Sequence, residues 1–317
     1  MTDGTPPIEA RGLLKRYGHV TAVDNIDLTV ERGDVYGFLG PNGAGKTTTL
    51  RMLLGLIRPD AGAARLFGRD PLEEGVRALQ GVAGFVEAPR FYPYLSGRRN
   101  LDLVAALDAD DAAGRIDEAL KTVELADRAG DKVGGYSHGM RQRLGIAGAL
   151  IRDPALLILD EPTTGLDPAG MRDMRVLVRR LAEQGITVLL SSHIMAEVEE
   201  LCDRLAIVRS GRVIYEGRLD ELLHSTGQRY RLRTTDDERA LEVAIHQPGV
   251  GDVLRDGDWL SLAADEEAAA GLSVALVEAG LGIRALVPAA ASLEELFFRL
   301  TEGDAANGAA PKERVPA

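Results

Sequence analysis

The chain has 317 residues, of which 45% are hydrophobic and 27% are charged, and its formal net charge is −12. This composition is that of a soluble globular protein, and the length suits one large domain and a smaller one. The sequence has no run of about 18 apolar residues, which excludes a membrane-spanning helix, and its acidic excess argues against a nucleic-acid partner.

Three short apolar runs in the first 220 residues end in polar residues: DVYGFLG (34–40), ALLILDEP (155–162) and ITVLLSSH (186–193). Helical segments separate them, so these runs predict strands buried on both faces of a mostly parallel sheet. The segment from about 87 to 152 has a mainly helical pattern and is expected to be an insert in this α/β domain. In such sheets, ligands bind at the carboxyl ends of the strands, where the polar residues lie.

The sequence pattern changes near Leu222, and residues 224–302 are predicted to form a second, smaller domain. Strand and helix signals follow one another in the order βαββαβ, with a hairpin at Asp256-Gly257-Asp258. This order indicates a ferredoxin-like α+β unit.

One more helix is predicted at SLEELFFRLT (292–301), where Ser292 and Glu295 form a capping-box pattern. Its apolar residues fall on one face, which we expect to cover the unit's own sheet, with a partner interface as the alternative. Residues 303–317 are predicted to be a disordered tail. The residues of the apolar face are Leu293, Leu296, Phe297 and Leu300.

The stretch GPNGAGKTT matches the pattern G-x-x-x-x-G-K-[ST] and lies between an apolar run and a helical segment, as that pattern requires. Its glycines let backbone N–H groups converge on phosphate oxygens. Lys46 is expected to reach the β- and γ-phosphates, and the Thr47 hydroxyl to ligate Mg²⁺. A chance glycine-rich turn is the alternative, but the context favours a P-loop that binds ATP. The residues predicted to contact the nucleotide are Gly40, Pro41, Asn42, Gly43, Ala44, Gly45, Lys46, Thr47 and Thr48.

Two adjacent acids, Asp160 and Glu161, follow the apolar run LLIL. Successive strand residues point to opposite faces, so the two carboxylates need not have the same role. One can hold Mg²⁺, directly or through water, while the other activates an attacking water as general base. Two exposed acids at a strand end are the alternative, which the neighbouring P-loop argues against.

The stretch YSHGMRQR (136–143) distinguishes one family among P-loop proteins. Here the chain resembles the ATP-binding cassette (ABC) family, the ATPase subunits of ABC transporters. The resemblance covers about 8–222. GPNGAGKTT resembles the Walker A loop, YSHGM the signature motif, LLILDE the Walker B motif, and GLDP (165–168) the D-loop. The predicted fold class is therefore α/β: a P-loop NTPase sheet domain with a helical insert, followed by the small ferredoxin-like α+β domain.

The resemblance implies roles for single residues. Tyr17 would stack on adenine, Glu87 would occupy the Q-loop position, and His193 would contact the γ-phosphate as the switch histidine. Glu161 would activate water. The predicted catalytic residues are Lys46, Glu161 and His193, and the predicted metal residues are Thr47, Glu87 and Asp160.

The resemblance also implies a dimer in which two cassettes clamp head to tail around two ATP molecules. Ser137 and Gly139 of one copy would bind the γ-phosphate held by the other, and Asp167 would bridge the two sites. The second cassette is a copy of this chain or a homologous cassette, and the clamp would drive a separate multi-span membrane permease. The signature has Tyr136, His138 and Met140 where LSGGQ has Leu, Gly and Gln, and His138 brings a side chain to a tight position.

Glu87 stands where the family usually has glutamine, and the segment after it, which ends YPYLSGRRNL, resembles the bacitracin- and lantibiotic-export type of cassette. The C-terminal SLEELFFRLT resembles the daunorubicin type of drug exporter. We therefore predict export of a drug, an antibiotic peptide or another amphiphile. A soluble ABC ATPase of translation or DNA repair is the main alternative, although such proteins usually carry two cassettes or long coiled-coil inserts. A P-loop metabolite kinase is a third reading, which the signature and D-loop argue against.

Four aromatic residues surround this glutamate: Phe85, Phe91, Tyr92 and Tyr94. In the family, this joint lies between the ATP site and the groove that receives a helix of the membrane subunit, and rings are efficient anchors at interfaces. For Tyr92 and Tyr94, docking and packing in the insert's own core are equally expected, whereas core packing is favoured for Phe85.

The cellular location follows from two features of the sequence. The first residues, MTDGTPPIEARG, do not have the pattern of a signal peptide, and the single cysteine, Cys202, fits a reducing compartment. We expect a cytoplasmic protein that is peripheral on the inner face of the cell membrane through its permease.

Overall fold

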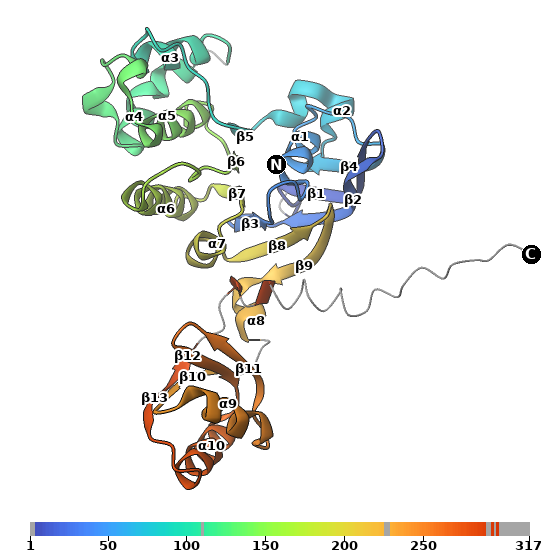
Figure 1. The fold of residues 1–317 in the computed structure, drawn as a ribbon. Coiled ribbons are helices and arrows are strands. Elements are labelled where there is room, and N and C mark those ends of the chain that lie inside the picture. Colours follow the sequence, from blue (N-terminus) through green and yellow to red (C-terminus); the bar gives the residue numbers. More distant parts are fainter. Residues whose placement is uncertain (1–3, 109–110, 225–228, 290–292, 295, 298–317) are drawn as a thin grey trace, which may run out of the picture. The chain divides into compact units, whose positions relative to one another are not determined.

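The computed structural model describes residues 4–108, 111–224, 229–289, 293–294 and 296–297 (Figure 1). The chain divides into two compact units, one that ends at Gly217 and one that begins at Arg218. Among the described residues, no helix combines the length and the apolar character that a bilayer crossing needs. Each unit has its own hydrophobic core.

The first unit contains a six-stranded sheet in the order β5-β6-β7-β3-β8-β9. The pairs β5–β6, β6–β7, β3–β7 and β3–β8 are parallel, which confirms the prediction from the apolar runs. Every residue of β3 and β6 is buried, because a sheet covered on both faces keeps its central strands out of water. The strands are β3 (Val35–Leu39), β5 (Val82–Phe85), β6 (Leu156–Asp160), β7 (Thr187–Ser192), β8 (Arg204–Arg209) and β9 (Arg212–Arg218).

Helices connect these strands. The helices α3, α4 and α5 lie together to one side of the sheet, and they fill the segment that was predicted to be a helical insert (Figure 1). The α-helices of this unit are α1 (Lys46–Leu53), α2 (Pro71–Glu74), α3 (Gly97–Ala105), α4 (Ile116–Thr122), α5 (His138–Leu150), α6 (Pro168–Glu183) and α7 (Met195–Leu201). Short 3₁₀ helices span Gly75–Leu79, Ala112–Arg115, Ala126–Arg128 and Val133–Gly135.

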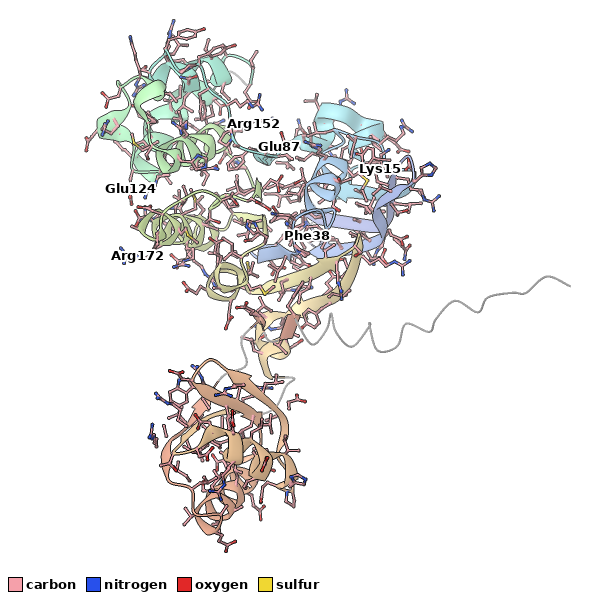
Figure 2. The ribbon with its side chains drawn as sticks, viewed as in Figure 1. Lys15, Phe38, Glu87, Glu124, Arg152 and Arg172 are labelled. Carbon is pink, nitrogen blue, oxygen red and sulfur yellow. The ribbon has the colours of Figure 1, made fainter. Side chains whose placement is uncertain are left out.

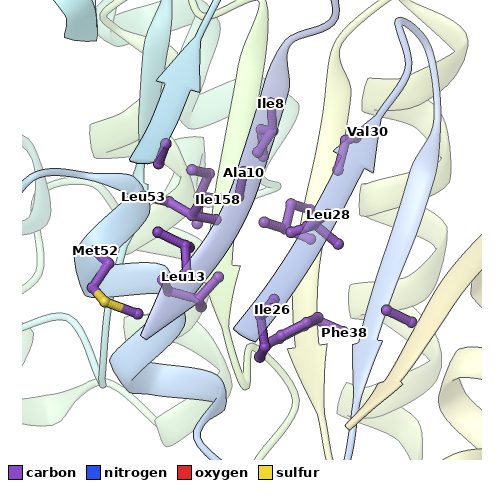
Figure 3. Close-up of a cluster of buried hydrophobic side chains, with 14 of the residues drawn as sticks. Ile8, Ala10, Leu13, Ile26, Leu28, Val30, Phe38, Met52, Leu53 and Ile158 are labelled. Carbon is purple, nitrogen blue, oxygen red and sulfur yellow. The ribbon is translucent and has the colours of Figure 1, made fainter. Parts of the chain in front are cut away.

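A three-stranded antiparallel sheet in the order β2-β1-β4 completes the unit, and the sequence pattern did not predict it. Its inner face meets α1 and the six-stranded sheet in one apolar cluster, where Leu13 and Leu28 lie with Leu53 of α1 and Ile158 of β6 (Figure 3). This cluster anchors the helix that follows the P-loop. The strands are β1 (Ile8–Tyr17), β2 (Val20–Val30) and β4 (Ala61–Leu66).

The strand β3 and the helix α7 approach each other closely. A Cβ added at Gly37 would lie 2.8 Å from a methyl carbon of Val198 and 2.9 Å from the sulfur of Cys202, so this contact needs a glycine. Cys202 is itself buried, and burial raises the pKa of its thiol.

The second unit has the predicted βαββαβ order, with the strands arranged β11-β12-β10-β13 and every pair antiparallel. This arrangement is that of a ferredoxin-like sheet, and β11 and β12 form the predicted hairpin. Leucines and alanines of β10, β12, α9 and α10 form its core. The elements are α8 (Leu219–His224), β10 (Arg229–Thr234), α9 (Asp237–His246), β11 (Gly251–Asp256), β12 (Trp259–Ala263), α10 (Glu266–Glu278) and β13 (Ile283–Ala289).

Most of the predicted last helix lies outside the described residues. Leu293 and Leu296 are described and are buried, as expected for the inner face of a helix. The capping residues Ser292 and Glu295, with Leu300 and the tail at 303–317, lie outside the described part of the chain.

Candidate functional site

The P-loop joins β3 to α1, and steric contacts require glycine at two of its positions. A Cβ at Gly40 would lie 2.4 Å from the carbonyl oxygen of Val208, and a Cβ at Gly45 would lie 2.3 Å from that of Ala22. Gly45 also has a φ of 102°, which side-chain-bearing residues rarely adopt. The loop therefore keeps its backbone N–H groups near the N-terminus of α1, where they can meet phosphate oxygens.

Lys46 has a buried side chain in the first turn of α1. Its Nζ donates to the carbonyl oxygens of Gly40 at 2.7 Å and Pro41 at 3.2 Å, and it lies 3.4 Å from Glu161 Oε1. These acceptors compensate for the burial of the ammonium group. They also hold the charge at the mouth of the loop.

Asp160, the last residue of β6, is buried and receives three hydrogen bonds. Thr47 Oγ1 donates to Oδ2 at 2.9 Å, the Glu87 backbone N–H donates to the same oxygen at 3.3 Å, and Ser191 Oγ donates to Oδ1. The Thr47 hydroxyl and the Asp160 carboxylate are thus adjacent oxygen ligands of the kind that Mg²⁺ prefers.

Glu161 begins the loop after β6 with a φ of 48°, a strained conformation for a residue with a side chain. Its N–H donates to Ser191 Oγ at 3.0 Å, and its Oε2 accepts a hydrogen bond from Thr164 Oγ1 at 2.9 Å. Burial acts to raise the pKa of Glu161, but the Thr164 bond and the charges of Lys46 and His193 outweigh it, so the pKa lies below its ordinary value. The carboxylate is therefore ionised at neutral pH.

His193 follows β7 and lies beside this carboxylate. Its Nδ1 is buried and is 3.3 Å from Glu161 Oε2, although the pair does not meet hydrogen-bond geometry. The structure thus brings together Lys46, Thr47, Asp160, Glu161 and His193, which the sequence had placed in three separate motifs.

Glu87 contacts this site through its backbone, whereas its side chain pairs with another residue. Its backbone N–H contacts Asp160, but its side chain is 60% exposed and pairs with Arg51 of α1 at 2.5 Å. The residue lies between α1 and the helical insert that contains α3, α4 and α5 (Figure 2). Its backbone φ is 68°. Its role at the metal stays a prediction.

The signature residues lie at the start of α5. Ser137 is the N-cap and accepts a hydrogen bond from the Met140 N–H at 3.2 Å. His138 Nε2 lies 3.0 Å from the carbonyl oxygen of Thr164, and because a carbonyl can only accept, this nitrogen carries the proton. The ring thus links the signature to the loop that follows Glu161.

Two cavities border this region. One of about 370 Å³ is lined by Thr47, Asp160 and Glu161 of the Walker motifs and by Glu87. The other, of about 570 Å³, is lined by Ser137, Gly139 and Asp167, which the first cavity does not contain. His138 lines both.

Tyr17 is half exposed at the end of β1, with Lys15 Nζ 5.7 Å from the centre of its ring. Its stacking on adenine stays a prediction.

Sequence reasoning missed several residues that support this site. Arg51, Ser191 and Glu197 contact predicted site residues or their neighbours, but each has the appearance of an ordinary helix or strand residue. The sequence did show two serines, Ser191 and Ser192, at the end of an apolar strand. Both are buried in the structure.

A glycine-rich loop with a buried lysine beside two carboxylates at the end of a parallel strand is the arrangement of a P-loop ATPase. A family model described as ABC transporter matches residues 23–164. The chain is 38% identical over 307 residues to the bacitracin transport ATP-binding protein BcrA of Bacillus licheniformis, a match that covers 93% of this chain and 97% of that protein. It is 41% identical over 306 residues to the daunorubicin resistance ATP-binding protein DrrA3 of Streptomyces coeruleorubidus, covering 94% and 96%.

A solved structure of an ATP-binding subunit of an ABC transporter agrees with the fold, with a TM-score of 0.61 and 30% identity over 69% of this chain and 92% of that chain. The chain belongs to the ABC transporter family. It is an ATP-hydrolysing subunit of an ABC exporter, as its motifs predicted, and a soluble ATPase of translation or DNA repair is not favoured.

Proposed function

We propose that this chain acts as a dimer around two ATP molecules and drives the efflux of a drug, an antibiotic peptide or another amphiphile through a separate permease. The observation that carries this proposal is the convergence of Lys46, Asp160, Glu161 and His193 at one end of the sheet. The relatives that are named for bacitracin transport and daunorubicin resistance support the substrate class.

The site residues divide the chemistry between them. Lys46 would exchange its contacts with the loop carbonyls for the β- and γ-phosphates of ATP, which are stronger partners for an ammonium group. Glu161, held ionised, would accept a proton from the attacking water. His193, 3.3 Å from that carboxylate, would contact the γ-phosphate next to the same water.

Thr47 of α1 and Asp160 at the end of β6 fit Mg²⁺. Thr47 and Asp160 would hold the ion, and Glu87 would join them by releasing Arg51. When bound, Mg²⁺ neutralises charge on the phosphate oxygens. Two or three protein ligands suit this ion, which keeps waters and phosphate oxygens in its remaining positions.

The position of the signature and D-loop residues supports the dimer. Ser137, Gly139 and Asp167 line a cavity that no Walker residue lines, so they would serve the ATP of a second cassette. Ser137 caps α5, and the positive end of that helix would attract the γ-phosphate of the second cassette's ATP.

Exposed rings support a permease-docking surface. Tyr92 and Tyr94 are 54% and 65% exposed, and their ring centroids are 5.8 Å apart. Exposed paired rings near the Q-loop suit contact with an apolar helix of a partner. We propose that the permease binds here and holds the chain at the cytoplasmic face of the membrane.

One experiment tests the dimer and the roles together. Glu161→Gln keeps the shape of the side chain but cannot accept the proton, so it should bind ATP without turnover. Gel filtration with Mg²⁺ and ATP should show a dimer of this variant, and a monomer without nucleotide. A monomer under both conditions would contradict the dimer.

The permease is tested by co-expression. The chain should be recovered with membranes when the permease is present, and Tyr92→Ala with Tyr94→Ala should reduce this recovery. Leu107→Ala, which removes another exposed apolar side chain, serves as the control. Co-purification with ribosomes or nucleic acid would instead favour the soluble alternative.

A further inference from the structure

Glu197 of α7 is a buried carboxylate outside every motif of the sequence, with 3% of its surface exposed. Its Oε2 accepts hydrogen bonds from Thr163 Oγ1 at 2.6 Å and from Ser192 Oγ at 3.1 Å. Its Oε1 is buried and has no hydrogen-bond partner within the described residues. Burying a carboxylate is unfavourable, so a position that needed packing alone would be better filled by an apolar side chain.

One of these two donors, Ser192, fixes the backbone around His193. It is the last residue of β7 and immediately precedes His193. Its carbonyl oxygen accepts from the N–H of Gly40 at 3.2 Å, and its Oγ accepts from the N–H of Ile194 at 3.0 Å. Ser192 therefore connects the start of the P-loop, the histidine and Glu197.

The other donor, Thr163, belongs to the loop that starts at Glu161 and leads to Asp167. It is buried, and its carbonyl oxygen accepts from the N–H of Leu166 at 3.1 Å. A single carboxylate oxygen of Glu197 thus joins the loop of the general base to the loop of His193.

We propose that Glu197 is a positioning residue for ATP hydrolysis, which fixes the separation between the Glu161 loop and His193. The inference rests on the roles proposed for Glu161 and His193, whose side chains are 3.3 Å apart. Displacing catalytic groups by about 1 Å can lower a rate about 100-fold, so one shared acceptor is enough to control turnover.

The test compares Glu197→Ala with Glu197→Gln. The alanine variant removes both hydrogen bonds, whereas the amide oxygen of glutamine can still accept both. We expect Glu197→Ala to lower kcat for ATP by about 10- to 100-fold while KM changes by less than about threefold, because the P-loop is intact. Glu197→Gln should restore kcat to within about threefold of wild type.

A matched control lies on the same helix. Glu200 is exposed and pairs with Arg175 at 2.9 Å, so Glu200→Ala should leave kcat unchanged. Thr163→Val and Ser192→Ala each remove one donor and should lower kcat less than Glu197→Ala does. These two variants keep the test valid if Glu197→Ala fails to fold.

Several outcomes would overturn the inference. They are wild-type kcat in Glu197→Ala, an equal loss of kcat in Glu197→Gln, or wild-type kcat in both donor variants. Glu161→Gln, measured in parallel, separates this failure from failure of the proposed function: full activity of that variant would overturn the role of Glu161 itself.

Discussion

In the first unit, Lys46 and Asp160 are as buried as the apolar core, whereas the core of the second unit is built from residues such as Leu232, Leu260 and Leu272. Arg229 is also buried in the second unit, but it donates to Ser261 of the neighbouring strand at 3.2 Å. Burial of charge is unfavourable unless partners compensate for it. In the first unit, Lys46 and Asp160 are therefore buried at the predicted ATP site, whereas the second unit keeps the charge of Arg229 within its own sheet.

This difference predicts that substitutions of buried charged residues in the first unit affect catalysis, whereas substitutions in the core of the second unit affect stability. In the first unit, polar groups converge from β3, β6 and β7 on one edge of a sheet. In the second unit, a small antiparallel sheet and the helices α9 and α10 are held together by apolar packing. The following variants test this distinction.

Lys46→Ala should have the largest effect, because it removes the buried charge that is expected to hold the phosphates. ATP hydrolysis, measured as phosphate release, should fall to background. Lys121→Ala, at an exposed position at the end of α4, should retain activity. Turnover near the wild-type rate in Lys46→Ala would refute the P-loop assignment.

Leu272→Ala should destabilise the second unit, since this side chain of α10 is fully buried in the apolar cluster. The expected loss is about 2–5 kcal/mol in the free energy of unfolding of that unit, with ATP turnover unchanged. Val274→Ala on the same helix, at a 59% exposed position, should cost much less. Thermal unfolding and an ATPase assay check both variants. Loss of turnover at temperatures where the second unit is still folded would contradict the expectation that its core affects stability alone.

Glu87→Gln should raise the Mg²⁺ concentration needed for half-maximal ATPase rate severalfold, because a neutral amide is a weaker ligand than a carboxylate. Arg51→Ala should lower it, since the structure pairs Arg51 with this carboxylate at 2.5 Å. Glu183→Gln, at an exposed position at the end of α6, is the control. Identical Mg²⁺ curves for all variants would show that Glu87 is an ordinary solvated loop carboxylate.

Removal of residues 224–317 should have the smallest effect on the ATP site, because every motif of that site precedes Leu222. We expect ATP binding by a folded truncation to match wild type, with any change confined to dimer lifetime or response to the permease. A folded truncation that binds no ATP would show that the proposed domain boundary is wrong.

The buried strands and the P-loop were predictable from sequence, because each has a local signature that tertiary structure does not alter. The same holds for the hairpin at Asp256-Gly257-Asp258, which lies between β11 and β12 as expected. The strands β1 and β2 were not predicted, since register shifts at Ala10, Leu13 and Lys15 break the alternation that sequence reasoning relies on.

The supporting residues of the site could not be predicted, because their partners are distant in the sequence. Arg51 and Glu87 are 36 positions apart, and Thr163 and Glu197 are 34 apart. Glu197 lies in MAEVEEL beside Glu199 and Glu200, and composition cannot show which of these acids is buried.

The burial of Cys202 has a practical consequence for experiments on this chain. It is the single cysteine of the sequence, and the raised pKa of its thiol leaves almost no thiolate to react with alkylating reagents in the folded protein. A cysteine introduced at an exposed position, such as Leu107 in the first unit or Leu254 in the second, would therefore be labelled selectively without prior removal of the native residue. Fluorophores at these two sites would follow clamp closure and permease contact in an otherwise unmodified sequence.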